Sequence, residues 1–168
     1  MENRFVKCAN YINYTWQHKK AFLRVEMQCR GFNSLRGYLH DVDKLFRYLA
    51  FLWGREDWEI QKAHRETSSH HAEYKRHPHT EEDYMLMVID WECAPLTKPD
   101  KPLNAFETLV HFYPEYINVM LPVCLVFDIE AVKPRIYLHP WHKLVKEPEY
   151  NREIFAKVCL TLNHIIET

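Results

Sequence analysis

Apolar residues recur in the first part of the chain at alternating gaps of four and three, which is the spacing of one helix face. The clearest run lies within residues 5–29 and consists of Tyr11, Thr15, His18, Phe22, Val25 and Cys29. This pattern predicts a first helix. Because His18 shares its apolar face, we expect the imidazole to point toward the interior with the apolar side chains.

A second run of the same spacing follows Asn33 or Ser34, either of which is a suitable helix cap. It consists of Leu35, Leu39, Val42, Phe46, Leu49 and Trp53. The pattern predicts one continuous helix that stops near Gly54 and turns this stripe inward. His40 and Asp41 are expected one turn into that helix.

A third helix is predicted over residues 56–76, where histidines stand in place of core residues. The face with the four-three spacing consists of Ile60, His64, Thr67, His71 and Tyr74. Seven residues turn a helix through about 700°, so His64 and His71 lie within about 20° of one another, whereas His70 lies about 120° away. We therefore predict that His71 points inward and that His70 lies along the flank.

The fourth predicted helix carries a carboxylate within an apolar body. Thr80 and Asp83 resemble a capping box, and residues 84–94 are apolar almost all round until Pro95 ends the pattern. Such a helix is expected in the middle of a domain, which would bury Asp90. A buried carboxylate is costly without a partner, and a metal ion is one of the few groups that offsets that cost.

The remaining chain is predicted as a helical extension over residues 104–168. Asn104 with Glu107 begins another helix, which Pro114 interrupts. The segment 115–132 fits either a buried helix or a short strand, a proline-spaced loop carries His139 and His142, and residues 151–166 have the pattern of an amphipathic helix.

Composition favours the same architecture. The chain has 168 residues, 47% of them hydrophobic, which is enough for a real core without requiring a second domain. Its three glycines are too few for the turns of a β-sandwich or for a glycine-rich phosphate loop. The expected fold is mostly α, a compact single-domain helical bundle over residues 1–168 with a metal-site core at residues 10–95.

Charge and patterning also narrow the function classes. The formal net charge of −1 and the lack of a basic stripe argue against nucleic-acid binding. We find no signal-like amino terminus and no apolar window long enough to span a bilayer, so we expect a cytoplasmic protein without a membrane partner. The five cysteines form no CxxC pair, which argues against a disulfide framework.

Histidine and aspartate residues follow one another in a suggestive order on the successive predicted helices. They are His18, His40, Asp41, His64, His70, His71 and Asp90. Imidazole and carboxylate ligands together suit divalent transition metals, and a helical bundle can bring ligands from several helices to one point.

This series resembles the HD-domain superfamily of metal-dependent phosphohydrolases, whose pattern is H…HD…D with an added pair of histidines in members that hold two metals. The resemblance covers residues 10–95 and includes the HDxxK form of the central motif, His40 to Lys44. It implies a helical bundle of the HD-domain type and hydrolysis of a nucleotide or another small phosphate ester. It also implies one or two divalent ions, with Mn, Fe, Co, Ni, Zn and Mg as the candidates.

The resemblance assigns roles residue by residue. The primary metal ligands would be His18, His40, Asp41 and Asp90. The second pair would be His64 with His70 or His71, which hold a second metal or face the phosphate.

Chemistry suggests further roles. Asp41 suits a bridging ligand, and Lys44 suits the offset of charge on a phosphoryl group, which makes these two the catalytic candidates. The candidates for substrate binding are Lys44, Arg65, His70 and Lys98. Asp43 and Glu92 are interpreted as supporting carboxylates or as a general acid or base.

Other interpretations remain open at this point. The protein is alternatively a non-catalytic, metal-stabilised helical interaction module, and the sequence leaves open whether it forms a homodimer. The histidines at positions 77 and 79 fit a surface patch. The tryptophans at positions 16, 53 and 91 are core or rim residues unless one of them stacks on a base.

Overall fold

The computed structural model describes residues 3–98, 100 and 103–129, and the regular structure in these residues is helical throughout. The predicted mostly α fold is confirmed. The elements in chain order are α1 Arg4–Arg30, α2 Leu35–Leu39, α3 Val42–Leu49, the 3-10 helix η1 Ala50–Trp53, α4 Asp57–Thr67, α5 Glu81–Thr97, α6 Ala105–Phe112, the 3-10 helix η2 Pro114–Tyr116 and α7 Ile117–Val126. The predicted helix at 151–166 and the loop with His139 and His142 lie outside the described residues.

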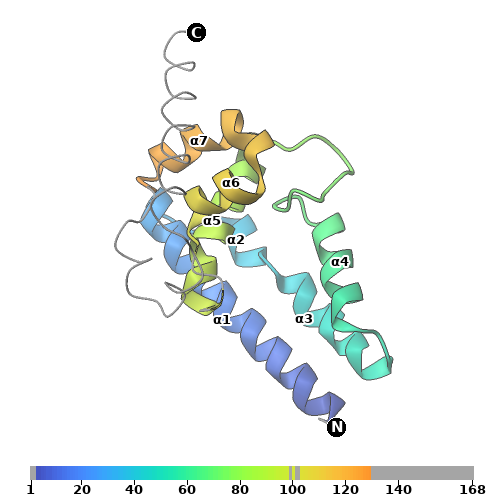
Figure 1. The fold of residues 1–168 in the computed structure, drawn as a ribbon. Helices are drawn as coiled ribbons and strands as arrows, with labels where there is room; N and C mark the ends of the chain where they lie inside the picture. The colour runs from blue at the N-terminus through green and yellow to red at the C-terminus, as the bar shows by residue number, and fades with distance from the viewer. Residues whose placement is uncertain (1–2, 99, 101–102, 130–168) are drawn as a thin grey trace, which may run out of the picture.

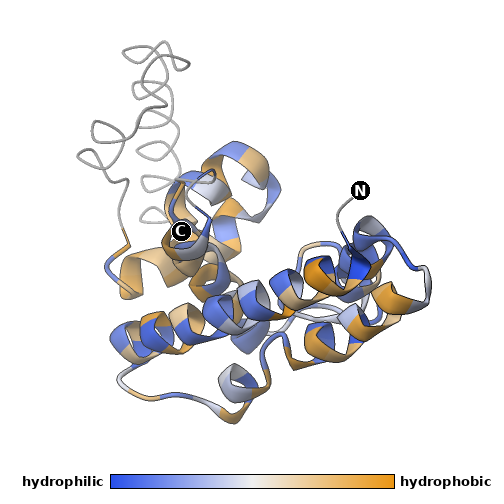
Figure 2. Ribbon diagram, turned by 90° about the horizontal axis from the view of Figure 1, so that it is seen from below, coloured by the Kyte–Doolittle hydropathy of each residue, from blue (hydrophilic) through white to orange (hydrophobic). Residues whose placement is uncertain are grey.

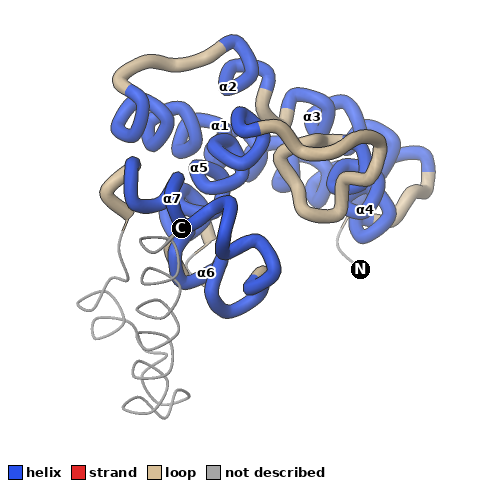
Figure 3. Tube along the Cα trace, turned by 90° about the horizontal axis from the view of Figure 1, so that it is seen from above, coloured by secondary structure: helices blue, strands red, loops and turns tan. Residues whose placement is uncertain are grey.

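Two helices form the centre of the bundle. The long α1 packs along α5, and it also contacts α2 and α3 (Figure 1). α4 packs on α3, whereas α6 and α7 pack on α5 and on each other. Figure 3 shows the same division from above, with α3 and α4 on one side and α6 and α7 on the other. His40 and Asp41 form the break between α2 and α3, where Asp41 lies near His18 of α1 and His64 of α4.

The core explains why α5 is apolar on most of its surface. Leu86 and Ile89 pack with Phe22 of α1, whereas Met87 and Val88 pack against α6 and α7. Because α5 has neighbouring helices on several sides, these four side chains are all at most 2% exposed. Figure 2 shows hydrophobic residues, in orange, interspersed with hydrophilic ones along the helices of the described part of the chain.

The predicted helix starts at Thr80 and Asn104 are confirmed. The Asp83 and Glu107 backbone N–H groups donate to the Thr80 and Asn104 side chains, and the carboxylates accept from the cap backbones in return. The predicted stop at Pro95 is wrong, because α5 continues to Thr97. Proline removes one backbone donor, and a single missing bond is tolerated in the last turn of a helix.

The segment after α6, which was ambiguous between strand and helix, is helical over η2 and α7. Pro114 takes the first position of η2, where a missing N–H costs nothing. In the described part of the chain no single helix is long and apolar enough to cross a membrane; α6 and residues 114–126, bent by 110°, meet that test of length and composition only as a joined pair.

The prediction of one continuous second helix is wrong. The chain breaks at His40 and Asp41, between α2 and α3, and Asp41 takes a left-handed backbone with φ 58°. Five residues of the predicted inward stripe are consequently 42–80% exposed, and they are Leu35, Leu39, Phe46, Leu49 and Trp53. Tyr48 and Phe51 are buried instead, since the break changes which face of the chain meets α1.

The predicted third helix is too long. α4 ends at Thr67, and Ser68 has extended backbone with φ −105° and ψ 118°. The Thr67 hydroxyl donates to the carbonyl of Ala63 at 2.7 Å, and the following serines favour turns over helix. Residues 68–80 therefore form a loop, and the helical register assigned to His70 and His71 does not apply.

Gly37 brings α2 against α1 at a point with no room for a side chain. A Cβ atom there would meet the carboxylate of Glu26, whose Oε2 would be 2.0 Å away. Glu26 is fully buried and accepts a hydrogen bond from the Ser34 hydroxyl at 2.6 Å. Close contact between the two helices thus depends on glycine.

We predict that Gly37→Ala destabilises the protein by about 1–3 kcal/mol, the usual cost of overpacking. The cost should fall in a Glu26→Ala background, because the crowded carboxylate is then absent. Urea unfolding of the two single variants and the double variant measures this coupling. An equal cost of Gly37→Ala in both backgrounds would contradict the packing described.

Candidate metal centre

The seven histidine and aspartate residues singled out by the sequence converge on one region between the helices. His18 comes from α1, and Asp90 comes from α5. The α2–α3 break supplies His40 and Asp41, α4 supplies His64, and the loop after α4 supplies His70 and His71. Five segments, spread over residues 18–90, therefore contribute to one cluster.

One half of the cluster joins α1, α5 and the α2–α3 break. His18 Nε2 lies 2.8 Å from Asp90 Oδ1, and His40 Nε2 lies 3.3 Å from the same oxygen. Asp41 is next to both imidazoles, with 4.0 Å between its Oδ2 and His18 Nε2 and 3.7 Å between its Oδ1 and His40 Nε2. These four residues are the ones that the HD resemblance gives as primary ligands.

The other half gathers three histidines around Asp41. Its Oδ1 lies 2.9 Å from His64 Nε2 and 3.7 Å from His70 Nε2. His71 Nε2 lies 2.9 Å from His64 Nε2. Asp41, His64, His70 and His71 lie close enough together to hold a metal ion, and so do His18, His40 and Asp41, so Asp41 belongs to both groups. Asp90 belongs to another such group, with His18 and Cys93.

The arrangement of donors and acceptors fits a cation. Both carboxylate oxygens of Asp43 lie 3.0 Å from His64 Nδ1, which assigns the proton of a neutral imidazole to that nitrogen. Burial alone would lower the pKa of His64, but its hydrogen bonds to Asp41 and Asp43 outweigh that effect and the pKa is raised. The surroundings of His64 Nε2, which lies 2.9 Å from Asp41 Oδ1, therefore favour a positive charge. A bound divalent ion would supply that charge in place of a proton.

Buried polar atoms that lack hydrogen bonds also indicate a cation site in the cluster. Among the buried side-chain atoms of the described residues that form no geometrically satisfactory hydrogen bond are His40 Nε2, Asp41 Oδ1 and His70 Nε2, although each lies 2.9–3.7 Å from an oppositely charged or ionisable neighbour in the cluster. Buried polar atoms normally have partners, so three such atoms in one cluster require an explanation. Coordination of an ion by these atoms provides one, and the donor set therefore fits a metal.

Protonation states in the cluster suit ligation. Burial alone would raise the pKa values of Asp41 and Asp90, but the neighbouring imidazoles, and Lys44 for Asp41, hold both well below the usual range. Burial lowers the pKa of His40 to about 4 and that of His71 well below its usual range. At neutral pH these groups are carboxylates and neutral imidazoles, the forms that bind metals.

Lys44 is engaged with the cluster. Its ammonium lies 3.0 Å from Asp41 Oδ2. Burial alone would lower the pKa of Lys44, but the charges of Asp41 and Asp90 outweigh it and the pKa is raised. The side chain remains a cation that neutralises part of the carboxylate charge.

Lys19 was missed by the sequence analysis, although it fixes the motif in place. It is 8% exposed, and its ammonium donates to the carbonyl of Tyr38 and to that of His40, the latter at 3.0 Å. These bonds join α1 to the α2–α3 break, where backbone carbonyls lack helical partners. The only indication of this role in the sequence was that Lys19 directly follows the inward-pointing His18 on the first predicted helix. A lysine at such a position is more often exposed to solvent.

Cys93 was also missed as a neighbour of the cluster. Its Sγ lies 3.8 and 3.9 Å from the two ring nitrogens of His18, and it forms a third compact group with His18 and Asp90. The thiol is fully buried, and that burial raises its pKa well above the usual value. A protonated thiol packs there as a small apolar residue.

Two predicted substrate-binding residues, Arg65 and Lys98, are not among the residues that line the cavity described below, although Lys98 interacts electrostatically with Lys44 and Asp90 of the cluster. Arg65 is exposed on α4 and lies 3.5 Å from Glu73, and Lys98 lies over the Tyr14 ring at 5.1 Å from its centroid. Burial lowers the pKa of Lys98, with Lys44 contributing in the same direction. Glu92, interpreted above as a supporting carboxylate, accepts a hydrogen bond at 3.0 Å from the backbone N–H of Ala105, the first residue of α6.

The remaining candidates have structural contacts. Trp16 and Trp53 are exposed on the surface, and Trp91 stacks on Tyr113 with ring centroids 4.7 Å apart. His77 is exposed, whereas His79 Nε2 lies 3.0 Å from the carbonyl of His71 and holds the loop after α4.

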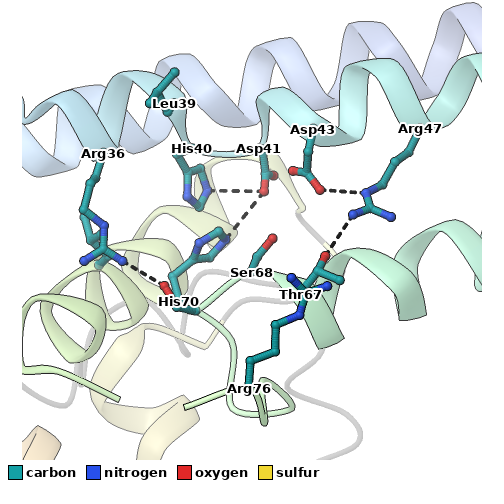
Figure 4. A pocket seen from close by; sticks show the side chains of 12 residues that line it. Arg36, Leu39, His40, Asp41, Asp43, Arg47, Thr67, Ser68, His70 and Arg76 are labelled. Atoms are coloured by element: carbon teal, nitrogen blue, oxygen red, sulfur yellow. Dashed lines mark hydrogen bonds and ion pairs between the residues drawn. The ribbon is translucent and has the colours of Figure 1, made fainter. Parts of the chain in front are cut away.

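A cavity of about 510 Å³ opens beside the cluster (Figure 4). His40, Asp41 and His70 lie in its wall, and their side chains point toward one another there. The other lining residues are Arg36, Leu39, Asp43, Arg47, Thr67, Ser68, Ser69, Arg76 and Leu86. A small molecule in this cavity would contact part of the cluster directly.

Comparison with family models, with curated proteins and with solved structures gave no match for this chain. Membership of the HD-domain superfamily therefore stays a prediction that rests on the motif.

We predict that Asp43→Asn lowers the affinity for Zn²⁺ by about 10- to 100-fold, the usual effect of removing a carboxylate that orients a ligating histidine. The amide removes the charge that fixes His64. Calorimetric titration of chelator-treated protein measures the effect. Glu66→Gln, on the exposed face of α4, is the matched control, and an unchanged affinity in Asp43→Asn would show that His64 is not oriented for a metal.

The loop geometry predicts that His70→Ala and His71→Ala each lower the bound metal. Both imidazoles face the Asp41–His64 half of the cluster, so this replaces the expectation that His70 lies on a helix flank. Metal analysis after dialysis gives the stoichiometry, with exposed His77→Ala as the control. Full retention of metal by either cluster variant would remove that histidine from the site.

Proposed function

We propose that this protein is a metal-dependent phosphohydrolase of the HD-domain type that acts on a nucleotide or another small phosphate ester. The observation that carries the proposal is the position of Asp41, which belongs to two histidine groups and lines the adjoining cavity. The motif order and the all-helical fold add support.

The residues that would hold the metal fall into two sets. His18, His40, Asp41 and Asp90 would hold one ion, and Asp41 with His64, His70 and His71 would hold a second. When bound, a divalent ion lowers the pKa of a coordinated water molecule and polarises phosphoryl oxygens.

The protein's own groups contribute binding and charge. Asp43 fixes the proton of His64 on Nδ1, so that Nε2 faces the cluster. The ammonium of Lys44 balances the Asp41 carboxylate and reduces the negative charge that an incoming phosphate would meet. His70 lies in the cavity wall next to Asp41, where it would contact a bound phosphate or complete the metal ligands.

The second candidate function is a non-catalytic module in which the metal only stabilises the bundle. Structural metal sites are closed by protein ligands, whereas catalytic sites keep a position open to water or substrate. The adjoining cavity favours the catalytic reading, because His40, Asp41 and His70 all line it.

A direct test measures phosphate release by the purified full-length protein. Nucleotides and p-nitrophenyl phosphate are offered with Mn²⁺, Co²⁺, Ni²⁺, Zn²⁺ or Mg²⁺, and metal content is measured on the same preparation. Metal-dependent release supports the phosphohydrolase. A metal-loaded, folded protein without release on any of these esters supports the structural module.

We predict that Asp41→Asn lowers phosphate release at least about a hundredfold, since it removes a charged ligand shared by both groups. Asparagine tolerates the left-handed backbone that Asp41 adopts, so the fold should persist. Asp128→Asn is the matched control, because Asp128 also has positive φ at 55° and is exposed beyond α7. Undiminished turnover by Asp41→Asn would rule out the proposed role.

A further inference from the structure

We propose that the cavity binds a substrate with at least two phosphate groups, one at the metal cluster and the other held by Arg36, Arg47 and Arg76. The placement of the first phosphate rests on the proposed function. The second anion site, formed by the three arginines in the same cavity, goes beyond the proposed function.

The three arginines reach the cavity from different segments. Arg36 comes from α2, Arg47 comes from α3, and Arg76 comes from the loop after α4. In Figure 4 they surround the cavity, with Arg36 and Arg47 on opposite sides and Arg76 across from His40 and Asp41. An anion inside the cavity would therefore meet guanidinium groups from several directions.

Two of these arginines are held in position before any ligand binds. Arg36 donates to the Ser69 hydroxyl at 2.8 Å and also to the carboxylate of Asp83. Arg47 donates from Nε to Asp43 at 2.7 Å and from Nη2 to the Thr67 hydroxyl at 2.9 Å. A guanidinium has five N–H donors, so each keeps donors for a ligand while losing little entropy on binding.

Charge also points to an anion. Arg36 and Arg47 are each paired with a carboxylate, whereas Arg76 is exposed and forms no ion pair with another described residue. Arg76 therefore adds uncompensated positive charge to the cavity opening. The hydroxyl-bearing Ser68 lies on the same wall and adds a neutral donor.

A substrate with one phosphate would leave these arginines unused. Its only phosphate would lie at the cluster, where metal ions and Lys44 provide the positive charge. Guanidinium groups arranged around a space match the several oxygens of a tetrahedral phosphate better than the two oxygens of a carboxylate. A diphosphate or bisphosphate compound satisfies both parts of the cavity.

The experiment is a calorimetric titration of Zn²⁺-loaded, full-length protein, because the first phosphate is proposed to lie at the metal. Release of orthophosphate from pyrophosphate is measured in parallel, so that binding is separated from turnover. Orthophosphate, pyrophosphate and malonate are the probes. The variants are Arg76→Gln, Arg76→Lys, Arg65→Gln on the α4 surface and Arg24→Gln on the exposed face of α1. Circular dichroism verifies the fold of each variant.

We expect pyrophosphate to bind more tightly than orthophosphate or malonate. Arg76→Gln should weaken pyrophosphate binding about tenfold, the contribution of roughly one charge-assisted hydrogen bond, and Arg76→Lys should restore part of it. Arg65→Gln and Arg24→Gln should leave the affinity unchanged.

Three outcomes would overturn the proposal: no pyrophosphate binding, equal affinity in Arg76→Gln, or malonate binding as tight as pyrophosphate. A weaker affinity in Arg65→Gln alone would place the second phosphate on the α4 surface and would equally overturn it. Phosphate release from p-nitrophenyl phosphate is measured separately with metal present. Failure of that assay with an intact arginine effect would count against the hydrolase and not against the anion site.

Discussion

The cost of burying two carboxylates among imidazoles is the constraint on which the rest of this structure depends. Asp41 is 3% exposed and the Asp90 side chain is 13% exposed, and both remain ionised because neighbouring groups hold their pKa values low. Isolated charges in such a place would cost several kcal/mol each. Five imidazoles and Lys44 surround them, and coordination of divalent ions would complete the compensation.

The backbone around the cluster is arranged to meet that constraint. A left-handed residue at Asp41 interrupts what would otherwise be one helix, and the carboxylate lies next to His64 of α4 and His18 of α1. Such a conformation is uncommon outside glycine and occurs at functional sites when the surroundings hold it. Here the surroundings are Lys19, which binds the His40 carbonyl, and Lys44, which binds the Asp41 carboxylate. The short α2 helix is the consequence.

Sequence periodicity predicted the helices that pack by a regular apolar face and failed where polar contacts override periodicity. α1, α5 and α6 follow their apolar pattern and caps, and the convergence of His18, His40, Asp41 and Asp90 follows from the motif order. The break at Asp41 was not predictable, because Leu35 to Trp53 keep helical spacing across it and only tertiary contacts of Lys19 reveal it. The stop at Thr67 was missed for a similar reason, since histidine spacing imitates a helix face.

The end of α4 at Thr67 changes the geometry of the half of the cluster that contains His64, His70 and His71. On a continuous helix His70 and His71 would diverge, whereas the observed loop turns both imidazoles toward Asp41 and His64. The cavity likewise opens toward arginines that no periodic pattern singled out. Positions of side chains on loops depend on packing between distant segments, which a single sequence does not encode in any local signal.

The central claim is that this histidine–aspartate cluster binds metal ions, and histidine nitrogen NMR during a Zn²⁺ titration tests it most directly. The account predicts that the Nε2 resonances of His18, His40, His64, His70 and His71 shift at stoichiometric metal, whereas those of exposed His77 and His111 stay unchanged. Shifts confined to the exposed histidines, with the cluster resonances unaffected, would contradict it.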